Sequence, residues 1–492
     1  MFDIILHKID ESFMGVECEP GIAMELRDRF SFFAENYKYH PKYKAKFWDG
    51  KIVLYRNNNT INVGLLSYFP DFCKERNYTL KIDPRLTTIN EFSREDAEKF
   101  IDTLGIPFKV RDYQIDAFVK AIRYKRKILL SSTGSGKSLI LYLIVRYLQE
   151  TKQKGLIVVP TVSLTQQMYK DFISYGYDSS KYCHIIYSGQ TKDADKFLYI
   201  STFQSLVTIK KGKCLDSRYF QQFDFLIIDE THKASSVSLT NIINACTKAE
   251  YKIGVTGTLK DSTIHELTLV GLLGTIYRAS STVDLIEKKF LSPFSIKSLV
   301  LKHPEEICKL AKKWSYHDEI NYLVTNTKRN DFIKNLALSL KGNTLVLFQL
   351  VTKQGKVLHK LIEDAADKER KIFFVFGGTD IKVRETVREI TEKASNAIII
   401  ASYAVFSTGT NLRNLHNIIF ASPSKSRIRN LQSIGRVLRL GDNKEKAVLF
   451  DIADDLRVGK HLNYTLQHYI SRLQIYNDEG FEYKTYAIDI KY

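Results

Sequence analysis

The stretch SSTGSGKS, residues 131–138, lies between two apolar runs and decides how the chain around it is interpreted. It meets the phosphate-binding pattern GxxxxGK[ST] at Gly136, Lys137 and Ser138, while Ser131 stands where the pattern has its first glycine. The run before it is typical of a strand and the run after it of a helix, which is the context that the motif requires. The stretch therefore predicts a nucleotide phosphate site. A flexible Gly/Ser turn that contains one lysine by chance is the alternative.

The chemistry of such a loop assigns a task to each residue type. Glycines at 134 and 136 let the backbone curl so that its N–H groups face the phosphates, and the helix that begins near Lys137 points its positive end at them. Lys137 would reach the β- and γ-phosphates, and the Ser138 hydroxyl would ligate Mg²⁺. ATP and Mg²⁺ are thus the predicted ligands. The loop residues expected to bind the nucleotide are Thr133, Gly134, Ser135, Gly136, Lys137 and Ser138.

Short apolar runs of β type alternate with helical patterns on both sides of this loop, which is typical of parallel sheets covered by helices. The first series of expected strands is 127–132, 155–160, 197–202, 225–230 and 252–258. The second series is 344–349, 371–378, 397–402, 417–422 and 446–452. The sequence therefore predicts an α/β fold with two such domains in tandem.

Two adjacent carboxylates, Asp229 and Glu230, end the fourth run of the first series in the motif LIIDETH. A P-loop enzyme needs one acid there for Mg²⁺ and a second one to orient the attacking water. A solvated surface pair is the alternative. The apolar residues 225–228 argue against it, because they indicate a strand that is buried on both faces.

A basic motif, QSIGRVLR, follows far downstream and contains Gln432, Arg436 and Arg439. The arginines are three positions apart, which predicts that they share one face of a helix. Planar guanidinium groups can stabilise charge on a transferring phosphoryl group. An ordinary basic helix face is the competing interpretation.

The two ends of the chain have a different texture. Residues 36–55 are dense in aromatics and lysines without a strand–helix rhythm, and we expect a small separate α+β module there. Tyrosines and leucines recur at helical spacing from about residue 461, which predicts a terminal helix packed on the second domain. The expected domains are 1–95 (a small accessory module), 96–287 and 288–460 (the two α/β domains) and 461–492 (helical extension).

The bulk composition is that of a multidomain globular protein with a basic surface. The chain has 492 residues and a formal charge of +18, which favours a polyanionic partner; a solvated basic protein without one is the alternative. Six dispersed cysteines, without metal-ligand spacing, indicate free thiols in a reducing compartment. No apolar run is long enough to cross a bilayer, and no leader is recognisable. A cytosolic protein without a membrane partner is expected.

Taken together, these motifs resemble the DExH helicases of superfamily 2, whose two RecA-like domains bind ATP in the cleft between them. RDYQ resembles the adenine-recognition element, STGSGKS motif I, DETH motif II, TGT (residues 256–258) motif III and QSIGRVLR motif VI. The resemblance implies an ATPase site formed by Lys137, Asp229, Glu230, Gln432, Arg436 and Arg439, with Mg²⁺ on Ser138 and Asp229. It adds Arg111, Tyr113, Gln114 and Gly409 to the nucleotide contacts, and a link between the domains through His232 and Gln432.

The same resemblance implies a nucleic-acid path. VVPTVSL looks like motif Ia, STFQSL like motif Ic, LVLFQ like motif IV and FSTGTNL (residues 406–412) like motif V. The residues that these motifs offer to a nucleic-acid backbone are Pro160, Thr161, Thr202, Gln204, Phe348 and Thr408. Lys44, Lys46 and Trp48 of the N-terminal module are further candidates, with solvated lysines and packed aromatics as the competing account.

Within superfamily 2 the chain resembles the phage UvsW-type recombination helicases, through FWDGKIVLY, ASYAVFSTGTNLRNLHNIIFAS and LQSIGRVLRLGD. This implies a monomeric, ATP-dependent helicase or translocase in the cytoplasm, which is that of the host cell if the chain is phage-encoded. It would unwind or branch-migrate forked and junction DNA, without reading its sequence, in recombination, repair and replication. An RNA helicase or the motor subunit of a restriction-type complex stays open, because the core motifs do not separate DNA from RNA. A DNA-binding protein with an inactive nucleotide fold is the non-enzyme alternative.

Overall fold

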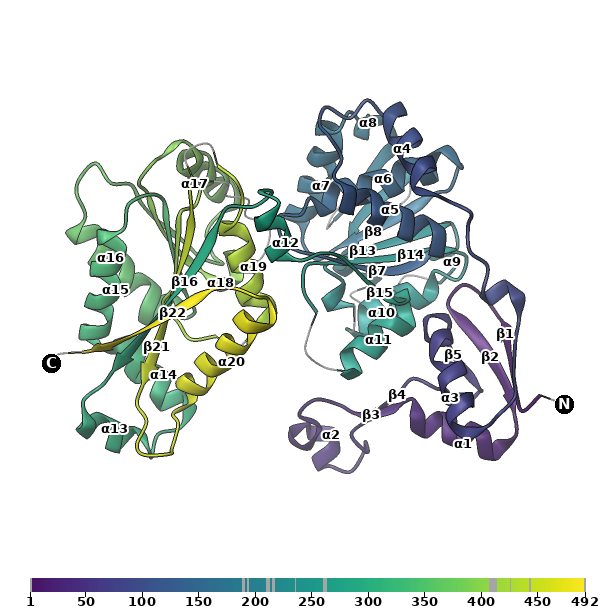
Figure 1. Ribbon diagram of the computed structural model, residues 1–492, viewed down its shortest axis with the longest axis horizontal. Coiled ribbons are helices and arrows are strands. Elements are labelled where there is room, and N and C mark those ends of the chain that lie inside the picture. The colour runs from purple at the N-terminus through teal and green to yellow at the C-terminus, as the bar shows by residue number, and fades with distance from the viewer. Residues whose placement is uncertain are drawn as a thin grey trace. The chain divides into compact units, whose positions relative to one another are not determined.

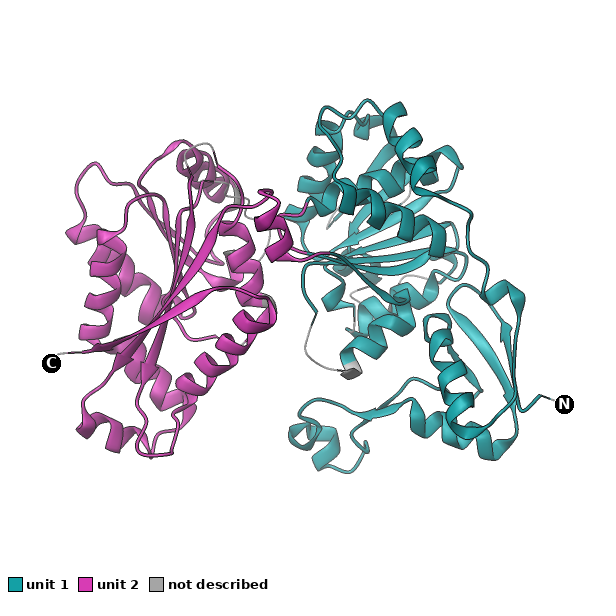
Figure 2. Cartoon of the chain, viewed as in Figure 1, with its two compact units in different colours: residues 1–131, 136–279 teal, residues 132–135, 280–492 magenta. Residues whose placement is uncertain are grey.

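The computed structural model gives the arrangement of most of the chain (Figure 1). It describes residues 2–187, 191–192, 194–208, 213–214, 217–234, 236–259, 263–406, 414–424, 426–441 and 444–490. The chain divides into two compact units, residues 1–131 with 136–279 and residues 132–135 with 280–492 (Figure 2).

The motor part of the first unit is built on a seven-stranded sheet in the order β15-β7-β14-β13-β8-β10-β9. All pairings from β7 to β9 are parallel. The strands are β7 (Arg126–Ser131), β8 (Gly155–Val159), β9 (Cys183–Ile186), β10 (Leu198–Thr202), β13 (Phe225–Asp229), β14 (Tyr251–Thr256) and β15 (Ile276–Ser280). The five strands expected from sequence are present, and β9 and β15 extend the sheet at its two edges.

Helices cover both faces of this sheet, which explains why its strands are apolar without alternation. Neighbouring strand residues belong to opposite cores: Leu129 packs with one face and Ile128 with the other, and the same holds for Ile157 and Leu156. The helices are α4 (Arg94–Thr103), α5 (Asp112–Tyr124), α6 (Lys137–Glu150), α7 (Val162–Ser174), α8 (Ser179–Tyr182), α9 (Ser217–Phe220), α10 (Val237–Ala245) and α11 (Thr263–Leu273). Two short strands, β11 (Val207–Thr208) and β12 (Lys213–Cys214), pair with each other in antiparallel orientation.

The N-terminal module is a small α+β domain with a mixed sheet in the order β5-β2-β1-β6. Its elements are β1 (Ile4–Lys8), β2 (Phe13–Cys18), α1 (Pro20–Arg29), β5 (Thr60–Asn62), α3 (Phe69–Arg76) and β6 (Leu80–Ile82). Between α1 and β5 the chain forms what we call the arm, residues 31–53. Antiparallel strands β3 (Ser31–Phe33) and β4 (Lys51–Val53) lead out from the module to the short helix α2 (Pro41–Lys44) (Figure 1).

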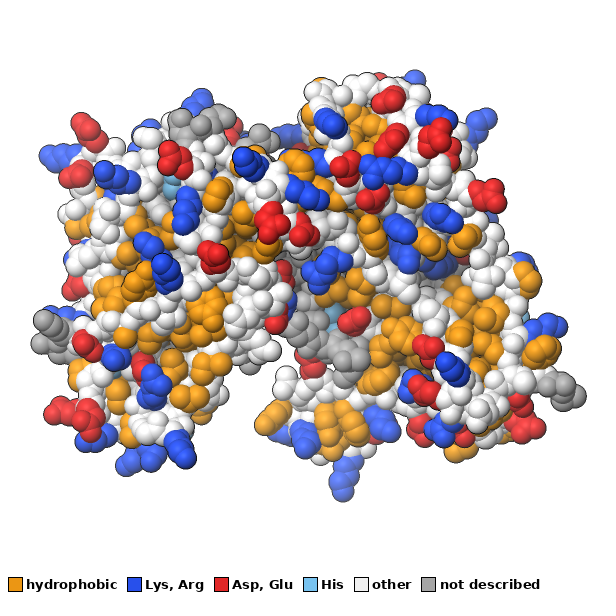
Figure 3. All heavy atoms as spheres, viewed as in Figure 1, with side chains coloured by type: hydrophobic (Ala, Val, Ile, Leu, Met, Phe, Trp, Pro, Cys, Tyr) orange, Lys and Arg blue, Asp and Glu red, His pale blue; other side chains and the backbone are white. Residues whose placement is uncertain are grey.

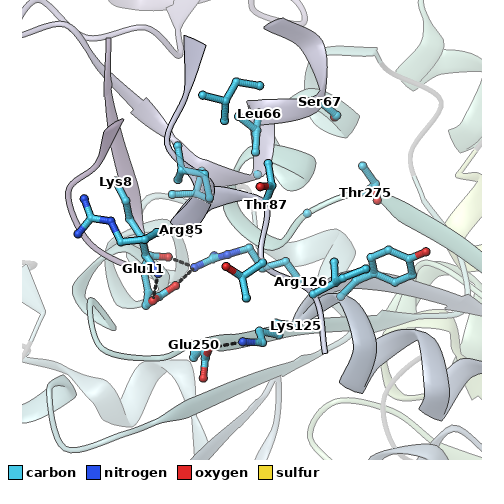
Figure 4. Close-up of a pocket in the computed structure, with 18 of the residues that line it drawn as sticks. Lys8, Glu11, Leu66, Ser67, Arg85, Thr87, Lys125, Arg126, Glu250 and Thr275 are labelled. Carbon is cyan, nitrogen blue, oxygen red and sulfur yellow. Dashed lines mark hydrogen bonds and ion pairs between the residues drawn. The ribbon is translucent and has the colours of Figure 1, made fainter. Parts of the chain in front are cut away.

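The module shares a core with the motor domain, because Leu267 and Val270 of α11 pack among its apolar side chains. Ion pairs surround a cavity of about 550 Å³ at this junction. Figure 4 shows Glu11 of the module beside Arg126 of β7; one oxygen of the Glu11 carboxylate accepts a hydrogen bond from Arg126 at 3.0 Å. Deeper in the junction, the fully buried Lys252 of β14 donates hydrogen bonds to the Ser12 hydroxyl and to the Ile243 carbonyl.

Replacing Lys252 with methionine is expected to raise the melting temperature at pH 7, by about 2–4 °C for each kcal/mol recovered. Burial, together with nearby Arg126, lowers the pKa of Lys252 from 10.5 to about 7 in the folded chain. The folded state therefore binds fewer protons than the unfolded state between these two values, so stability rises with pH across this window. The cost of burying the lysine is full below pH 7 and fades toward pH 10.5.

Melting curves at pH 7 and pH 9.5 test this prediction. The advantage of the methionine variant should be larger at pH 7, and an advantage that does not change with pH would contradict it. Lys99→Met, at an exposed lysine of α4, is the matched control and should not change the pH dependence.

The second unit repeats the α/β plan with a sheet in the order β18-β19-β17-β20-β21-β16-β22, all pairs parallel. Its strands are β16 (Phe294–Lys302), β17 (Thr344–Phe348), β18 (Ile372–Val375), β19 (Ile398–Ser402), β20 (Asn417–Phe420), β21 (Ala447–Asp455) and β22 (Tyr483–Asp489). Its helices are α12 (Thr282–Glu287), α13 (Glu305–Ala311), α14 (Tyr316–Thr325), α15 (Thr327–Ser339), α16 (Lys356–Ala365), α17 (Ile381–Lys393), α18 (Tyr403–Phe406), α19 (Arg427–Val437) and α20 (Tyr464–Asp478). The prediction of two parallel-sheet domains with a small α+β domain is confirmed.

The C-terminal extension contains the expected helix, α20, and also a strand that was not predicted. β22 adds to the sheet edge beside β16, with residues 483–489 opposite residues 296–302. Five cysteines are described as free thiols. Over the described part of the chain, no helix combines the length and the apolar character that crossing a membrane requires.

Candidate active site

The predicted P-loop lies between β7 and α6, as the motif requires. Gly134 and Gly136 have φ values of +87° and +79°, in the left-handed region where residues other than glycine are strained. A Cβ on Gly136 would also come within 2.5 Å of the Gln114 amide nitrogen. Lys137 is the first residue of α6, and its ammonium donates a hydrogen bond to the Ser131 carbonyl at 3.2 Å. The loop thus has the glycine-dependent left-handed backbone and the inward-turned lysine of a phosphate cradle.

Serine in place of the first glycine is compatible with this loop. Ser131 is the last residue of β7 and is fully buried. Its φ is not in the left-handed region, so no glycine is required there. Thr133 and Gly134 are partly exposed, Ser135 is buried, and Ser138 is partly exposed on the first turn of α6.

The residues expected to bind adenine gather at the start of α5, beside the P-loop. Gln114 accepts a hydrogen bond from the Arg111 backbone N–H at 3.0 Å, and its amide nitrogen lies 3.5 Å from the Gly136 carbonyl. Arg111 also donates to the Tyr113 hydroxyl at 3.0 Å. Three predicted residues are therefore held together next to the loop that carries Lys137.

The acid pair stands at the carboxyl end of β13. Asp229 is the last residue of this strand and accepts a hydrogen bond from the Glu230 N–H at 2.9 Å. Glu230 adopts φ +53°, a left-handed backbone that costs a residue with a side chain about 1–3 kcal/mol. Such strain is often found at functional sites, and here it turns the second carboxylate out of line with the strand.

The pKa values of the two carboxyl groups are shifted in opposite directions. Burial and the neighbouring Glu230 charge raise the pKa of Asp229 to about 7, although Lys137 acts against this rise. Burial also acts to raise the pKa of Glu230, but the hydrogen bond from His232 and the Lys137 ammonium outweigh it and hold that pKa below its usual value. Two adjacent buried carboxylates repel each other, so a bound cation would stabilise the state in which both are ionised. This fits the predicted Mg²⁺.

Motif II is connected to motif III inside the first unit. The His232 ring nitrogen Nδ1 lies 3.3 Å from the Glu230 carboxylate and 3.1 Å from the Thr256 hydroxyl, and the latter donates to the Thr258 carbonyl at 2.9 Å. All the partners described for His232 are thus residues of motifs II and III. The link from His232 to Gln432 stays a prediction.

Thr231, which sequence reasoning did not single out, anchors this motif. Its buried hydroxyl lies 3.0 Å from the Ile228 carbonyl and 3.1 Å from the Val255 carbonyl, so it ties β13 to β14. The absence of a side chain at Gly254 leaves space for Thr231, because a Cβ at position 254 would be 2.7 Å from the Thr231 hydroxyl. The available signal was a hydroxyl residue directly after two carboxylates at a strand end.

Strand order explains why these motifs meet. β7, β14 and β13 are neighbours in the parallel sheet, so the loops with motifs I, III and II leave it at one edge. The loops expected to contact nucleic acid follow β8 and β10, which are next in the order, and leave at the same edge. One edge of the sheet therefore carries both the candidate nucleotide residues and the candidate nucleic-acid residues.

The residues of this sheet edge that are candidates for nucleic-acid contact differ in exposure. Pro160 is buried, and Thr161 caps α7 by accepting a hydrogen bond from the Leu164 N–H. The Thr202 hydroxyl is 2.8 Å from that of Ser205. Gln204 has an exposed side chain. Of these residues, Gln204 and the amino end of α7 are the groups most available to a phosphate backbone.

The arm separates the aromatic candidates into two kinds. Trp48 packs locally, since its indole N–H donates to the Lys51 carbonyl at 2.8 Å and its ring lies against His40. Tyr39 and Phe47 have exposed fractions of 76% and 87%. Lys44 and Lys46 are exposed as well. Figure 3 shows basic and hydrophobic side chains side by side on the arm.

In the second unit, Gln432 and Arg436 lie four positions apart on one face of α19, both partly buried. The prediction that Arg436 and Arg439 share a helix face is wrong, because α19 ends at Val437. Arg439 follows the helix end, where its carbonyl accepts hydrogen bonds from the Ser292 hydroxyl and the Lys444 ammonium.

Phe348 is a core residue rather than a surface one. Its ring is fully buried at the end of β17, stacks on Phe374 with centroids 5.5 Å apart and packs on Gly355. Its side chain is therefore not available to a nucleic acid. Thr408 and Gly409 of motif V lie outside the described residues.

Comparisons with known proteins cover all three folded parts. Family models match at residues 3–83 ("DNA helicase UvsW, N-terminal"), 107–261 ("Type III restriction enzyme, res subunit") and 327–441 ("Helicase conserved C-terminal domain"). These ranges lie inside the three expected folded domains, whose exact limits stay predictions.

A similar relative is the ATP-dependent DNA helicase uvsW of Enterobacteria phage T4, 34% identical, with 99% of this chain and 100% of the relative covered. Its crystal structure matches with a TM-score of 0.53 over 99% of this chain and all of that one. The DNA 3'-5' translocase XPB2 of Sulfurisphaera tokodaii is 25% identical, with 73% of this chain and 85% of the relative covered. A DNA-bound type ISP restriction-modification enzyme, LlaBIII, shares the fold alone, at 14% identity and a TM-score of 0.59 over 86% of this chain and 34% of that one.

Two parallel-sheet domains, the P-loop and the DExH acid pair define a superfamily 2 helicase. The match to uvsW extends over the whole chain, including the N-terminal module, and therefore identifies a particular family within this superfamily. The chain belongs to the UvsW family of ATP-dependent DNA helicases.

Proposed function

We propose that the protein is an ATP-driven monomeric motor that unwinds or branch-migrates forked and junction DNA in recombination, repair and replication. The observation that carries the proposal is the arm, which projects from a UvsW-type N-terminal module and exposes aromatic rings among lysines. Lysines hold duplex arms through their phosphates without reading sequence, and exposed rings stack on unpaired bases. A branch point is the DNA structure that offers both.

In the proposed ATPase site, Lys137 and the P-loop N–H groups bind the β- and γ-phosphates. Glu230 orients the attacking water, and Arg436 with Arg439 stabilises charge on the transferring phosphoryl group. Gln432 assists at the same site, and Arg111, Tyr113 and Gln114 hold the adenine. Ser138 and Asp229 would hold Mg²⁺, which neutralises phosphate charge when bound.

Contacts to the nucleic-acid backbone are proposed for Thr161, Thr202 and Gln204. Because these residues and motifs I, II and III follow strands of one sheet at the same edge, a change at the nucleotide can alter the grip on DNA. Alternation between a tighter and a looser grip, in step with ATP binding and hydrolysis, would move the protein along a strand.

Strand displacement on model forks and four-way junctions, with and without ATP, tests the proposed substrate. ATP-dependent conversion of these substrates, faster than that of linear duplex ends, is the expected result. ATPase rates with forked DNA, linear duplex DNA and RNA form the second arm of the test. Strongest stimulation by RNA would overturn the proposal.

The double variant Lys44→Gln/Lys46→Asn is expected to bind forked DNA about 10-fold more weakly at moderate salt and to lower the slope of log affinity against log salt by about 1.8, because two phosphate contacts are lost. Asparagine suits position 46, where φ is +59°. Fluorescence anisotropy at several salt concentrations measures both quantities.

Lys74→Gln/Lys81→Gln is the matched control, since both lysines are exposed on the same module but lie outside the arm. It should leave most of the slope in place. Equal slope changes in the two double variants would mean that the arm has no special role.

A further inference from the structure

We propose that Arg472 and Asp451 are positioning residues for ATP hydrolysis, holding the start of the motif VI helix from the C-terminal extension. The inference rests on the proposed role of Arg436 and Arg439. Arg472 lies on α20 and Asp451 on β21, outside every helicase motif of the sequence. Both side chains are buried, at 1% and 0% exposure.

The two side chains form a bidentate ion pair. Arg472 Nη2 lies 2.8 Å from one Asp451 oxygen, and Nε lies 2.9 Å from the other. The Tyr476 hydroxyl donates to the same carboxylate at 2.9 Å. These contacts satisfy the aspartate and leave one arm of the guanidinium fork, Nη1, for another acceptor.

That acceptor belongs to the β20–α19 connection, of which residues 421–424 and 426 are described. Arg472 Nη1 donates to the Ser424 carbonyl at 3.3 Å, and Asn430 of α19 donates to the same oxygen at 3.2 Å. Ser426, two positions later, is the N-cap of α19. The guanidinium therefore holds the backbone at the point where the motif VI helix begins.

Other buried donors hold the rest of this connection. Arg329, which is paired with Asp454 of β21, donates to the Ala421 carbonyl at 3.0 Å. Tyr403, the first residue of α18, donates to the Ser422 carbonyl at 3.2 Å. Three of the carbonyls described in the connection, at 421, 422 and 424, thus accept hydrogen bonds from buried side chains.

Stability alone does not account for such a pair. Replacing a buried ion pair with well-packed neutral residues is often neutral for stability or even stabilising, whereas a planar fork that joins a carboxylate to a carbonyl fixes direction as well as distance. Arg436 is ten residues after the N-cap, on the order of 15 Å along the helix. A tilt of about 4° at the helix start would move it by about 1 Å, enough to cost about 100-fold in rate.

Two partly exposed ion pairs of Arg427 also connect the start of α19 with the C-terminal extension. Arg427, the first residue of α19, pairs with Asp478 at 2.8 Å and with Glu479 at 2.6 Å, at the end of α20. The helix α20 thus contacts the start of the motif VI helix through a buried link and a partly exposed one.

The neutral double variant Arg472→Met/Asp451→Asn tests the proposal in the full-length chain, with saturating forked DNA. We expect kcat for ATP to fall at least about 10-fold, with KM for ATP changed less than about 3-fold, while the melting temperature stays within a few degrees. Tyr403→Phe, which removes one hydrogen bond and no charge, should fold normally and lower kcat by a smaller factor. Wild-type kcat in a folded double variant and in Tyr403→Phe would overturn the proposal.

Glu319→Gln is the matched control. The buried Glu319 accepts hydrogen bonds from Asn463, Tyr464 and Thr465 at the start of α20. Among the described residues, it has no hydrogen bond to the β20–α19 connection. It should lower the melting temperature and leave kcat unchanged. An equal loss of kcat in this variant would mean that any loosening of α20 impairs the enzyme, and would contradict a specific role of Arg472.

A double-mutant cycle separates this inference from the proposed function. In an Arg436→Ala background the neutral double variant should cost little further activity, because both changes act through the arginine at the end of α19. Full turnover by Arg436→Ala alone would refute the proposed ATPase site. Loss of turnover in Arg436→Ala together with a full, additive loss from the Arg472→Met/Asp451→Asn change would refute only the positioning role.

Discussion

Lys137→Ala is expected to lower DNA-stimulated ATP turnover at least about 100-fold, since removing one preorganised donor from developing charge typically costs 100- to 1,000-fold. Lys137 is the first residue of α6, its ammonium turns back into the loop toward the Ser131 carbonyl, and its charge acts on both acids of the DExH motif. Lys137 is the only lysine in the P-loop sequence SSTGSGKS. The rate of phosphate release with saturating forked DNA is the measurement.

Two further measurements make this result specific. The melting temperature should stay close to that of the unaltered chain, because Lys137 is only partly buried and alanine is a strong helix former at the first position of α6. Lys99→Ala, at an exposed lysine of α4, should keep full turnover. If Lys137→Ala hydrolysed ATP at the normal rate, the nucleotide site would have to be elsewhere.

Glu230→Gln is expected to bind ATP but to lower turnover at least about 100-fold. The amide keeps the size of the side chain and loses the charge that orients and polarises the attacking water. Binding of a fluorescent ATP analogue should change by a small factor, while kcat falls. A parallel loss of nucleotide affinity would indicate that Glu230 holds the nucleotide rather than the water.

A companion variant separates the backbone of Glu230 from its chemistry. Glu230→Gly should be as inactive as Glu230→Gln, but it relieves the left-handed strain at φ +53°, worth about 1–3 kcal/mol. Its melting temperature should therefore equal or exceed that of Glu230→Gln. The opposite order would mean that the contact between His232 and Glu230 outweighs the strain.

Much of the candidate site could be predicted from short-range patterns. A P-loop depends on glycines at fixed spacing and on a strand–helix junction, and both are visible in SSTGSGKS and the apolar runs beside it. The acid pair was placed correctly at a strand end, because the apolar residues before it can only be buried. The exposed rings of the arm could not be told from its packed ones, since Trp48 and Phe47 are adjacent and differ only in which finds a partner.

The sequence by itself determined the class of fold, the nucleotide-binding loop and the helicase family, because each depends on residue types at fixed separations along the chain. Only the tertiary structure decided that Phe348 belongs to the core, that Arg439 lies beyond its helix and that β22 completes a sheet. It alone brought Arg472 to Asp451 and Ser424. The physical reason is that strand pairing and burial join residues far apart in sequence, and the identity of one residue carries no record of its distant partner.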